Sequence, residues 1–390
     1  MTDMTRRGLF GVAAGAAVGM VANADAQPGH EGHKQDELPT FKYAMENQRG
    51  KVTEGGSAKE ATVKQLPIST GIAGVSMRLK PGGIRELHWH ANAAEWAFVV
   101  KGRVRTTVIA PDGTSETNEF GPGDVWYFPR GHGHLLVGLG PDEAHFVLVF
   151  DNGAFSEHGT FSITDWVGHT PPTVLSRGLG LPQSVFTGLP KQELYIPQGR
   201  IPPAQPEPNL QGAMRTSPQT HAYQLMAQQP TTRFAGGTEW RVTAREFPVS
   251  RTITGAIMEL EPGAVREPHW HPHANEWLYV IRGQIRMGLF GSGGRARDED
   301  FGAGDAGYVP QGFGHYIDNI GSERCRVLIA FDSGEYQEIS LSTWLAANPA
   351  HLVADNFKMS DDLAKKLPKR RVFIATKDGP PVEPSPAEHR

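Results

Sequence analysis

Residues 85–102 read RELHWHANAAEWAFVVKG, and the spacing within this stretch decides the fold and the site together. His88 and His90 are two positions apart, so in a β-strand their side chains point to the same face. Glu95 follows across a turn and can return to that face. Two interpretations are open for this stretch taken alone, a solvated polar face and a metal centre.

The stretch occurs a second time, 181 residues later, where residues 266–283 read REPHWHPHANEWLYVIRG. The same offset is kept without a gap from about residue 81 to residue 151, through matched Gly, Asp, Tyr, Pro and His positions. A repeat this long indicates two copies of one domain rather than a short-period solenoid. The length of 390 residues agrees with two domains plus extensions.

The composition favours an all-β protein. The chain contains 46 Gly and 30 Pro, which suits many short strands joined by tight turns. Runs such as WAFVVKGRVRTTVIA and WLYVIRGQIRMGLF predict strands, and the PDG and SGG triplets at 111–113 and 292–294 predict hairpin turns. We therefore expect two closed antiparallel barrels or sandwiches, each followed by a short helix, near 162–170 and near 340–348.

Charge and cysteine content exclude several classes of partner. The net charge is −4 with 21% charged residues, so nothing suggests nucleic acid or an anionic membrane as a partner. Cys325 is the single cysteine, which rules out an internal disulfide. We expect Cys325 to be a buried strand residue.

The first 26 residues have the layout of an export signal. Arg6 and Arg7 precede the modest apolar run GVAAGAAVGMV, and Ala24-Asp25-Ala26 supplies small residues at a cleavage position. The arginine pair resembles a twin-arginine signal, which predicts a periplasmic or secreted protein. A disordered N-terminus and a membrane anchor are the alternatives, but the run is short and rich in Ala and Gly for an anchor.

These observations divide the chain into five segments. They are a signal peptide (1–26), an N-terminal extension (27–55), a first barrel domain (56–218), a second barrel domain (219–377) and a poorly ordered tail (378–390). The end of the first domain, rich in Pro, Gln and Asn, is the expected connection to the second.

A second matched string adds a third histidine to each copy, because GDVWYFPRGHGH ends at His134 and GDAGYVPQGFGH ends at His315. Three imidazoles and one carboxylate inside a barrel suit a divalent ion such as Mn, Fe, Ni or Zn, and geometry alone does not choose among them. Because the whole set recurs at one offset, we favour two metal centres over solvated polar pairs. The predicted ligands are His88, His90, Glu95 and His134 in the first copy and His269, His271, Glu276 and His315 in the second.

Both copies read G-x5-H-x-H-x4-E-x6-G followed by G-x5-P-x-G-x2-H, which resembles the paired motif of the cupins. The asparagine that often follows is present as Asn319 and is replaced by Gly138 in the first copy. Two copies make a bicupin, and the chain is similar to the bicupin oxalate decarboxylases over roughly residues 40–370, through RELHWH, AEW, FSE, TDWVGHTP and SLSTWL. The resemblance implies two tandem cupin barrels (double-stranded β-helix, or jelly roll) with short flanking helices.

The resemblance also implies a reaction, the cleavage of oxalate to formate and carbon dioxide. It implies two Mn2+ ions per chain and dioxygen as a co-catalyst that is needed but not consumed. Arg85, three residues before His88, is expected to clamp the free carboxylate of oxalate, and Arg266 to do the same in the second domain. An exposed strand-end charge is the alternative for both. Tyr195 resembles a family tyrosine that hydrogen-bonds near the first site.

Glu157 is the proton-transfer residue that the resemblance implies. The family carries this glutamate on a mobile lid, SENST, which here reads Ser156-Glu157-His158-Gly159-Thr160. His158 and Gly159 depart from the family's Asn and Ser; the glycine is expected to make the lid more flexible. The related oxalate oxidases lack this glutamate. Without the resemblance, Glu157 would be interpreted as a solvated loop acid.

The second site is expected to differ from the first. The position that aligns with another family glutamate is Ile329, which cannot transfer protons, so the first site is expected to be the decarboxylating one. Trp89 and Trp270, inside the two HWH motifs, match positions that the family places at a subunit contact, where they would relay electrons. Barrel packing is the alternative. Family members form trimers and hexamers, so a homo-oligomer is expected.

Three rival functions stay open. An oxalate oxidase would produce carbon dioxide and hydrogen peroxide instead of formate. A metal-dependent dioxygenase or isomerase acting on a larger acid would need a wider pocket. A non-enzymatic storage bicupin would usually have lost its metal ligands, whereas this chain retains all eight.

Overall fold

The computed structural model describes residues 37–206 and 217–380, apart from the side chains of residues 157 and 158. The predicted signal peptide (1–26) lies outside these residues, as does the predicted tail (378–390) beyond residue 380. Within the described ranges, no helix is long and apolar enough to cross a membrane.

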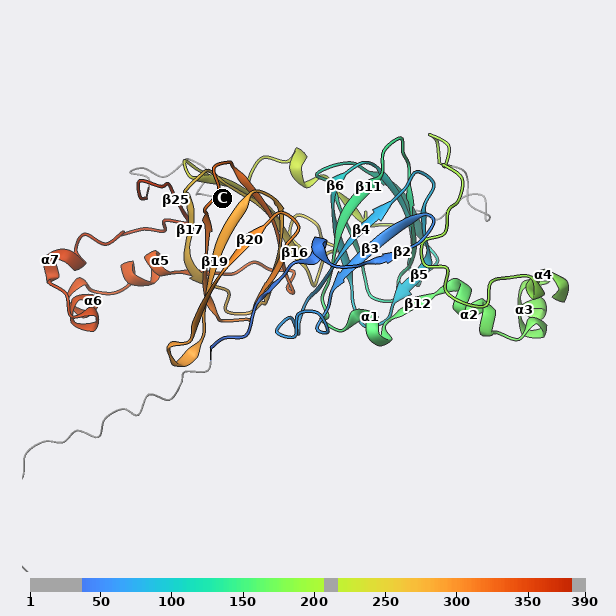
Figure 1. Ribbon diagram of the computed structural model, residues 1–390, viewed down its shortest axis with the longest axis horizontal. Coiled ribbons are helices and arrows are strands. Elements are labelled where there is room, and N and C mark those ends of the chain that lie inside the picture. Colours follow the sequence, from blue (N-terminus) through green and yellow to red (C-terminus); the bar gives the residue numbers. More distant parts are fainter. Residues whose placement is uncertain (1–36, 207–216, 381–390) are drawn as a thin grey trace, which may run out of the picture. The chain divides into compact units, whose positions relative to one another are not determined.

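The first barrel consists of two antiparallel sheets (Figure 1). The order of strands is β13-β9-β6-β11-β4-β3-β2 in the larger sheet and β12-β5-β10-β7-β8 in the smaller one. The larger sheet contains β2 (Lys51–Val52), β3 (Gly56–Ala61), β4 (Ala73–Leu79), β6 (Glu95–Lys101), β9 (Val125–Phe128), β11 (Ala144–Phe150) and β13 (Ala222–Tyr223). The smaller sheet contains β5 (Ile84–His90), β7 (Val104–Ile109), β8 (Ser115–Phe120), β10 (Gly133–Gly138) and β12 (Thr160–Ser162).

The second barrel repeats this arrangement. Its larger sheet has the order β1-β21-β18-β23-β16-β15-β14, and its smaller sheet has the order β20-β19-β22-β17-β24, with β25 (Ile374–Ala375) also paired to β17. The larger sheet contains β1 (Lys42–Tyr43), β14 (Thr232–Phe234), β15 (Gly237–Val242), β16 (Thr254–Leu260), β18 (Glu276–Arg282), β21 (Ala306–Val309) and β23 (Cys325–Phe331). The smaller sheet contains β17 (Val265–Trp270), β19 (Gln284–Phe290), β20 (Ala296–Gly302), β22 (Gly314–Asn319) and β24 (Ile339–Ser340).

The all-β, two-barrel prediction is confirmed. Side chains alternate between buried and partly exposed along β10 (GHLLVG) and β22 (GHYIDN), as expected for strands with one face toward a core. The PDG triplet joins β7 to β8, and the SGG triplet forms the 3-10 turn η3 (Ser292–Gly294) between β19 and β20. Cys325 is buried at the start of β23, as predicted.

Each barrel is completed by a short strand that precedes the other barrel in the chain. β1, which lies before the first barrel, pairs with β21 of the second. β13, which lies before the second barrel, pairs with β9 of the first. Each of these strands is followed by a 3-10 turn, η1 (Met45–Asn47) and η2 (Leu225–Ala227). Residues 42–43, predicted as part of an extension, are therefore built into a sheet.

The two barrels share one hydrophobic core that contains Trp96 and Trp277. Trp277 of the second barrel packs on Gly74 of the first, where a Cβ would lie 2.0 Å from a ring carbon. Trp96 packs in the same way on Gly255, where the distance would be 2.1 Å. Only glycine fits at these two positions, so the tryptophans interlock the larger sheets of the two barrels.

Short helices follow each barrel (Figure 1). The helices expected near 162–170 and 340–348 are α2 (Ile163–His169) and α5 (Leu341–Ala346). The other helices are α1 (Phe155–His158), α3 (Pro172–Leu179), α4 (Gln183–Thr187), α6 (Ala350–Phe357) and α7 (Asp361–Ala364). None of these five was predicted; for α3, α4 and α6 the reason is that prolines read as loop signals, whereas here Pro171, Pro182 and Pro349 precede these helices.

Candidate metal centres

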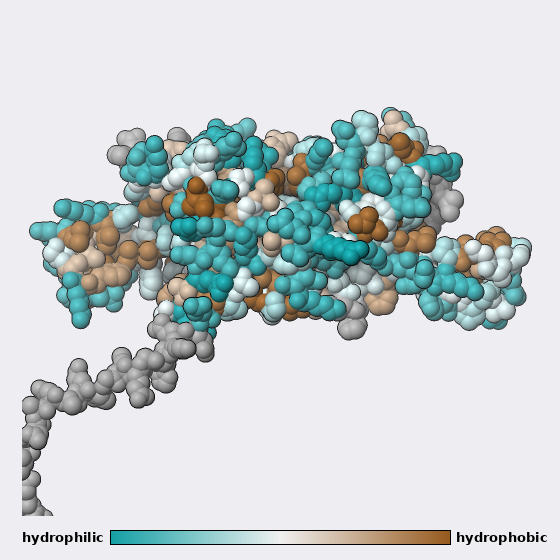
Figure 2. Space-filling model, in the orientation of Figure 1, coloured by the Kyte–Doolittle hydropathy of each residue, from teal (hydrophilic) through white to brown (hydrophobic). Residues whose placement is uncertain are grey.

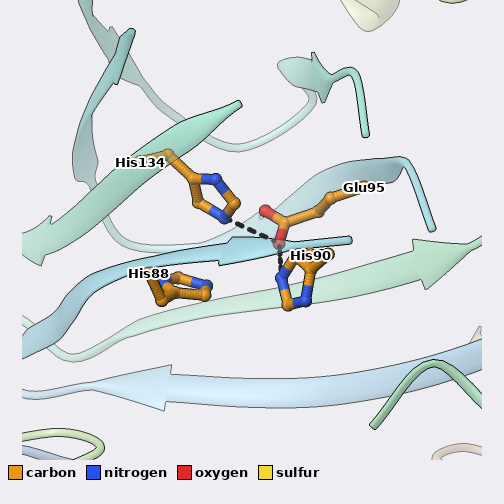
Figure 3. Close-up of side chains that lie close together, drawn as sticks. All are labelled: His88, His90, Glu95 and His134. Atoms are coloured by element: carbon orange, nitrogen blue, oxygen red, sulfur yellow. Dashed lines mark hydrogen bonds and ion pairs between the residues drawn. The ribbon is translucent and has the colours of Figure 1, made fainter. Parts of the chain in front are cut away.

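Strands of the first barrel bring together the four ligands predicted in the first copy. His88 and His90 are on β5, Glu95 begins β6, and His134 on β10 is paired with His88 across the two strands. All four side chains are buried, and their ligand atoms lie within 4.8 Å of one another. Figure 3 shows the four side chains directed at one point, with one Glu95 oxygen contacting both His90 and His134.

The second barrel builds its centre in the same way. His269 on β17 is paired with His315 on β22, His271 directly follows β17, and Glu276 begins β18. These side chains are also buried, with ligand atoms within 4.8 Å of one another. Each chain therefore contains two buried metal sites of three histidines and one glutamate, composed of the residues that the sequence predicted.

The second ring nitrogen of each histidine is held by an oxygen. In the first centre, Nδ1 of His88 lies 2.6 Å from the Glu86 carbonyl oxygen, and Nδ1 of His134 lies 2.9 Å from the His132 carbonyl oxygen. Because a carbonyl oxygen only accepts, each Nδ1 carries the proton and Nε2 keeps its lone pair for a metal. Carbonyl oxygens hold Nδ1 in the same way in the second centre, in His269, His271 and His315.

The environment of the first centre favours the metal-binding protonation states. Burial, and then the charge of Arg85, lowers the pKa of His88 well below its usual value, and burial lowers the pKa of His90 to about 4. Burial alone would raise the pKa of Glu95, but the imidazoles of His134 and His90 hold that pKa well below its usual value. At mildly acidic pH, His88 and His90 are therefore neutral and Glu95 is ionised, as metal binding requires.

Both donor sets fit a divalent metal ion. Oε1 of Glu276 is buried without a hydrogen-bond partner among the described residues, and Nε2 of His134 and Nε2 of His271 have only the ligand carboxylates beside them, at 3.3 and 3.0 Å. A buried polar atom without a partner is costly, and these atoms lie where the other ligands converge. Three imidazoles and a carboxylate leave two positions free on a six-coordinate ion, so each centre can bind a metal and still accept a ligand.

The two carboxylate ligands are held differently. Trp126 Nε1 donates to Oε1 of Glu95 over 2.8 Å, while Oε2 faces the histidines. The residue that matches Trp126 in the repeat is Gly307, which has no donor side chain, and Oε1 of Glu276 has no hydrogen-bond partner in the described part of the chain. The first carboxylate is thus oriented by a contact that the second one lacks.

A cavity of about 380 Å³ opens beside the first centre and is lined by Arg85 together with His88, His90 and Glu95. Arg85 is buried on β5, and its Nη1 donates to the Tyr195 carbonyl oxygen over 3.3 Å. The guanidinium also stacks on the Tyr195 ring, with 4.4 Å between Cζ and the ring centroid. Arg85 is therefore a fixed cation in the wall of this cavity and not an exposed strand-end charge.

Tyr195 also lines this cavity. Its backbone N–H donates to Glu86 over 2.7 Å, which holds the residue in a left-handed conformation with φ of 66°. Burial raises the pKa of its phenol, so the hydroxyl stays protonated. The predicted hydrogen bond from Tyr195 to a ligand stays a prediction.

The sequence did not single out Lys51 and Glu193, two charged residues at the same cavity. Nζ of Lys51 lies 3.7 Å from the Tyr195 ring centroid and 2.9 Å from Oε2 of Glu193, whose Oε1 is 3.7 Å from Nη1 of Arg85. Glu193 is two residues before Tyr195 in the sequence, which is the one signal that could have indicated it.

Arg266, the predicted counterpart of Arg85, is buried and paired with an acid. It donates to the Phe373 carbonyl oxygen over 3.3 Å, stacks on the Phe373 ring at 3.8 Å, and forms an ion pair with Glu338. The arginine arrangement of the first centre is thus repeated with an added carboxylate. A role for Arg266 in substrate binding stays a prediction.

The helix that carries Glu157 borders the first cavity, because Phe155 and Ser156 of α1 line it. The side chain of Glu157 lies outside the described part of the structure, so its role stays a prediction. Gly159 is buried, and a Cβ there would lie 1.9 Å from Oδ1 of Asn92. A Cβ there would also lie 2.5 Å from the Phe155 carbonyl oxygen, so the lid conformation seen here favours glycine at this position, independently of any effect on flexibility.

Trp89 and Trp270 lie on the outer face of the strands that carry the histidines, not in the barrel interior. Trp89 stacks on Phe161 and contacts Trp166, which is 61% exposed. Trp270 contacts Trp344, which is 57% exposed. Packing inside the barrel is thus excluded for both, and their proposed electron relay stays a prediction.

Comparisons with known proteins agree with this architecture. The family model described as cupin matches residues 44–185 and 223–365. The oxalate decarboxylase of Bacillus subtilis is 41% identical over 340 residues, which cover 87% of this chain and 88% of that protein. A probable oxalate decarboxylase of Arthroderma benhamiae is 35% identical, with 87% and 84% covered. A solved structure of the Bacillus subtilis enzyme matches with a TM-score of 0.81 at 39% identity, over 87% of this chain and 88% of that one.

The two matches to the cupin model fall on the two barrels, and the full-length similarity spans both centres. The ligand set, the duplicated motif and the extent of identity all lead to the same family. The chain is a two-domain cupin and belongs to the bicupin oxalate decarboxylase family.

Proposed function

We propose that this protein is a manganese-dependent oxalate decarboxylase that acts mainly at its first centre. The observation that carries the proposal is the cavity of the first barrel, where a fixed arginine and four metal ligands line one small space. Relatives that cover most of the chain are oxalate decarboxylases, and the Bacillus subtilis relative has Mn(II) centres. A volume of about 380 Å³ is sufficient for a small dianion such as oxalate.

Arg85 would bind the substrate in this cavity. Oxalate has two carboxylates, and when one lies at the metal the other needs a cation and hydrogen-bond donors in a dry site. The planar guanidinium supplies parallel N–H donors to a carboxylate, and the Tyr195 carbonyl and ring fix its orientation. The substrate is thereby oriented with its C–C bond between the metal and the arginine.

Glu157 would take the proton from oxalate and return it. In the overall reaction the C–C bond of hydrogen oxalate breaks, carbon dioxide leaves, and the carbon that remains receives a proton to give formate. Manganese with dioxygen, when bound, supplies the one-electron redox chemistry that makes this bond labile. Glu157 is assigned the proton transfer because α1, which carries it, borders the cavity.

The preference for the first centre rests on two differences between the barrels. Arg85 lines a cavity, whereas Arg266 is ion-paired with Glu338. The position that would supply a second glutamate is Ile329, which is buried in the hydrophobic core of the second barrel. The second metal would then contribute to stability or to electron exchange.

The products of oxalate turnover test the proposal. The mature, manganese-loaded protein is incubated with oxalate in aerated, mildly acidic buffer, and formate and hydrogen peroxide are both measured. Formate in nearly equal yield to the oxalate consumed, with little peroxide, is expected. Peroxide without formate would make the protein an oxidase, and neither product with metal bound would refute the oxalate proposal. Omitting dioxygen should stop formate production.

We also propose that the protein is exported and forms a homo-oligomer, a trimer or hexamer. The paired arginines near the N-terminus support twin-arginine export to the periplasm or beyond. Exposed aromatic residues beside Trp89 and Trp270, and apolar side chains visible on the helical segments in Figure 2, support assembly through these faces. Cell fractionation with an Arg6→Lys, Arg7→Lys variant and light scattering of the mature protein test the two proposals.

A further inference from the structure

The arginines of the two centres are held by the same framework. Arg85 and Arg266 each donate from Nη1 to a carbonyl oxygen over 3.3 Å, from Tyr195 and Phe373. Each of these aromatic residues has a positive φ, 66° and 59°, and each receives the arginine on its ring face. The backbone N–H groups of Tyr195 and Phe373 donate to the carboxylates of Glu86 and Glu267. The two guanidinium groups therefore occupy equivalent places beside the two metal centres.

The charges around the two arginines differ. Oε1 of Glu193 lies 3.7 Å from Nη1 of Arg85, which is too long for a hydrogen bond. Arg266 has Glu338 in direct contact on Nη2. The first arginine lies in a cavity and the second is closed off by an acid of the same chain.

Both oxygens of Glu338 face cationic groups, although only Oε2 accepts hydrogen bonds from the described residues. Oε2 contacts Arg266 and accepts from the Tyr336 hydroxyl, and Oε1 lies 2.5 Å from Nη2 of Arg371. Its side chain is 8% exposed. Two arginines and one hydroxyl around a single buried carboxylate form a carboxylate-binding site.

Glu338 can reach Arg266 because one connection of the second barrel is shorter than its equivalent in the first. Phe155 and Tyr336 are equivalent, because each contacts the imidazole of the second histidine of its HWH motif, His90 and His271. The following strands β12 and β24 are also equivalent, since each pairs with the HWH strand of its barrel. The first barrel places residues 156–159 of the lid between Phe155 and the start of β12, whereas the second barrel has only Gln337 and Glu338 between Tyr336 and the start of β24.

We propose that Glu338 is a built-in ligand that fills a carboxylate-binding site of Arg266, Arg371 and Tyr336 at the second centre, so that this centre is closed to small carboxylate anions. The ligand class rests on the proposed function, because the equivalent arginine of the first centre is assigned to a carboxylate of oxalate. Removing the Glu338 side chain leaves Arg266 buried without an anion, which is strongly unfavourable. The vacated site is then expected to take an anion from solution.

Rescue by acetate tests the proposal without depending on turnover. The full-length, manganese-loaded Glu338→Ala variant is melted with increasing sodium acetate, beside wild type and with sodium chloride at equal ionic strength. The variant is expected to melt at a lower temperature than wild type in chloride and to recover in acetate along a saturable curve. Acetate that binds at the first centre or at either metal shifts wild type as well, so the difference between the two curves measures the new site.

Glu259→Ala is the matched control. Glu259 is a buried acid on β16, away from both centres, that contacts Arg326 over 2.6 Å, Arg324 over 3.3 Å and Arg282 over 3.5 Å, and these arginines are 34%, 51% and 49% exposed. Water can replace the carboxylate there, so the control is expected to lose stability without saturable rescue. The double variant Arg266→Met, Glu338→Leu removes both charges. Its melting temperature is expected to be close to that of wild type and to show no saturable increase with acetate.

Each outcome decides the proposal. Rescue confined to Glu338→Ala supports it, and folding of this variant only when acetate is present supports it equally. Absence of rescue, or equal rescue of Glu259→Ala or of the double variant, overturns it. If wild type makes no formate from oxalate while acetate still rescues Glu338→Ala, the proposed function fails and the carboxylate site stands.

Discussion

Arg85→Lys separates the geometry of the substrate clamp from its charge. Lysine keeps the positive charge but presents one donor direction instead of a planar fork, and it loses the stacking on Tyr195 that holds the guanidinium 4.4 Å from the ring centroid. The Tyr195 carbonyl, 3.3 Å from Nη1, also loses its donor. The variant should therefore still attract oxalate but orient it poorly.

The expected loss follows from these contacts. One charge-assisted hydrogen bond to the substrate contributes about 1.5–3 kcal/mol. This loss corresponds to a roughly 10- to 150-fold lower kcat/KM, at about 1.4 kcal/mol per tenfold change. The cation–π contact with Tyr195 is also made in the free protein, so its loss lowers the stability of the variant by about 0.5–1 kcal/mol. The loss in kcat/KM should fall on both kcat and KM, because orientation and binding are affected together.

The assay is steady-state formate production by the manganese-loaded variant, with metal content and melting temperature measured on the same sample. Arg105→Lys is the control, because Arg105 is buried in the same barrel, pairs with Glu119 over 2.5 Å and does not line the cavity. The control should lose some stability and keep its kcat/KM. An Arg85→Lys variant with wild-type kcat/KM, or a control that loses as much, would refute this reasoning.

Three further predictions concern metal content and stability. Glu276→Gln weakens one of two metal sites, so elemental analysis should find about half the metal of wild type; full occupancy would contradict the ligand assignment. Gly74→Ala pushes a Cβ into Trp277 and should lower the unfolding free energy by about 1–3 kcal/mol in a denaturation assay. Gly178→Ala is the control, because Gly178 lies on an open surface of α3; it should be neutral or stabilising by up to about 1 kcal/mol. Burial lowers the pKa of His145 to about 4. The unfolded chain therefore takes up a proton that the folded chain refuses as pH falls from about 6.5 to about 4. Wild type should therefore lose up to about 3 kcal/mol of unfolding free energy over this pH range, and His145→Gln should not. Urea titrations at several pH values measure this difference, and an equal pH dependence in both proteins would contradict it.

Most of the correct predictions, the metal ligands and the two barrels, came from the spacing of residues close together in the sequence. The ligands His88 and His90 are two residues apart on one strand, and the repeat supplied their counterparts, so no long-range information was needed to find them. The barrels followed from the same repeat and from strand-like runs bounded by turns. The motif spacing and the strand-like runs each lie within a contiguous stretch of sequence, where periodicity can be recognised.

Features that depend on distant contacts could not be predicted. Glu193 and Lys51 meet at the first cavity although 142 residues separate them. Glu338 reaches Arg266 because a connection is shortened, and a shortened loop becomes informative only once the paired strands are known. The two-residue strand β1 is too short for any period, so its pairing with β21 has no sequence signal.

The exchange of β1 and β13 makes each half of the chain an incomplete protein. A barrel expressed alone from residue 56 to the connection would lack the strand that the opposite half supplies, and would expose the edge of β9 to pairing with another copy. A single barrel whose N-terminal strand crossed to a partner would give this connectivity after tandem duplication. The present chain is then equivalent to a covalently fused dimer, whose second half pairs its arginine with Glu338 while the first half leaves Arg85 at a cavity.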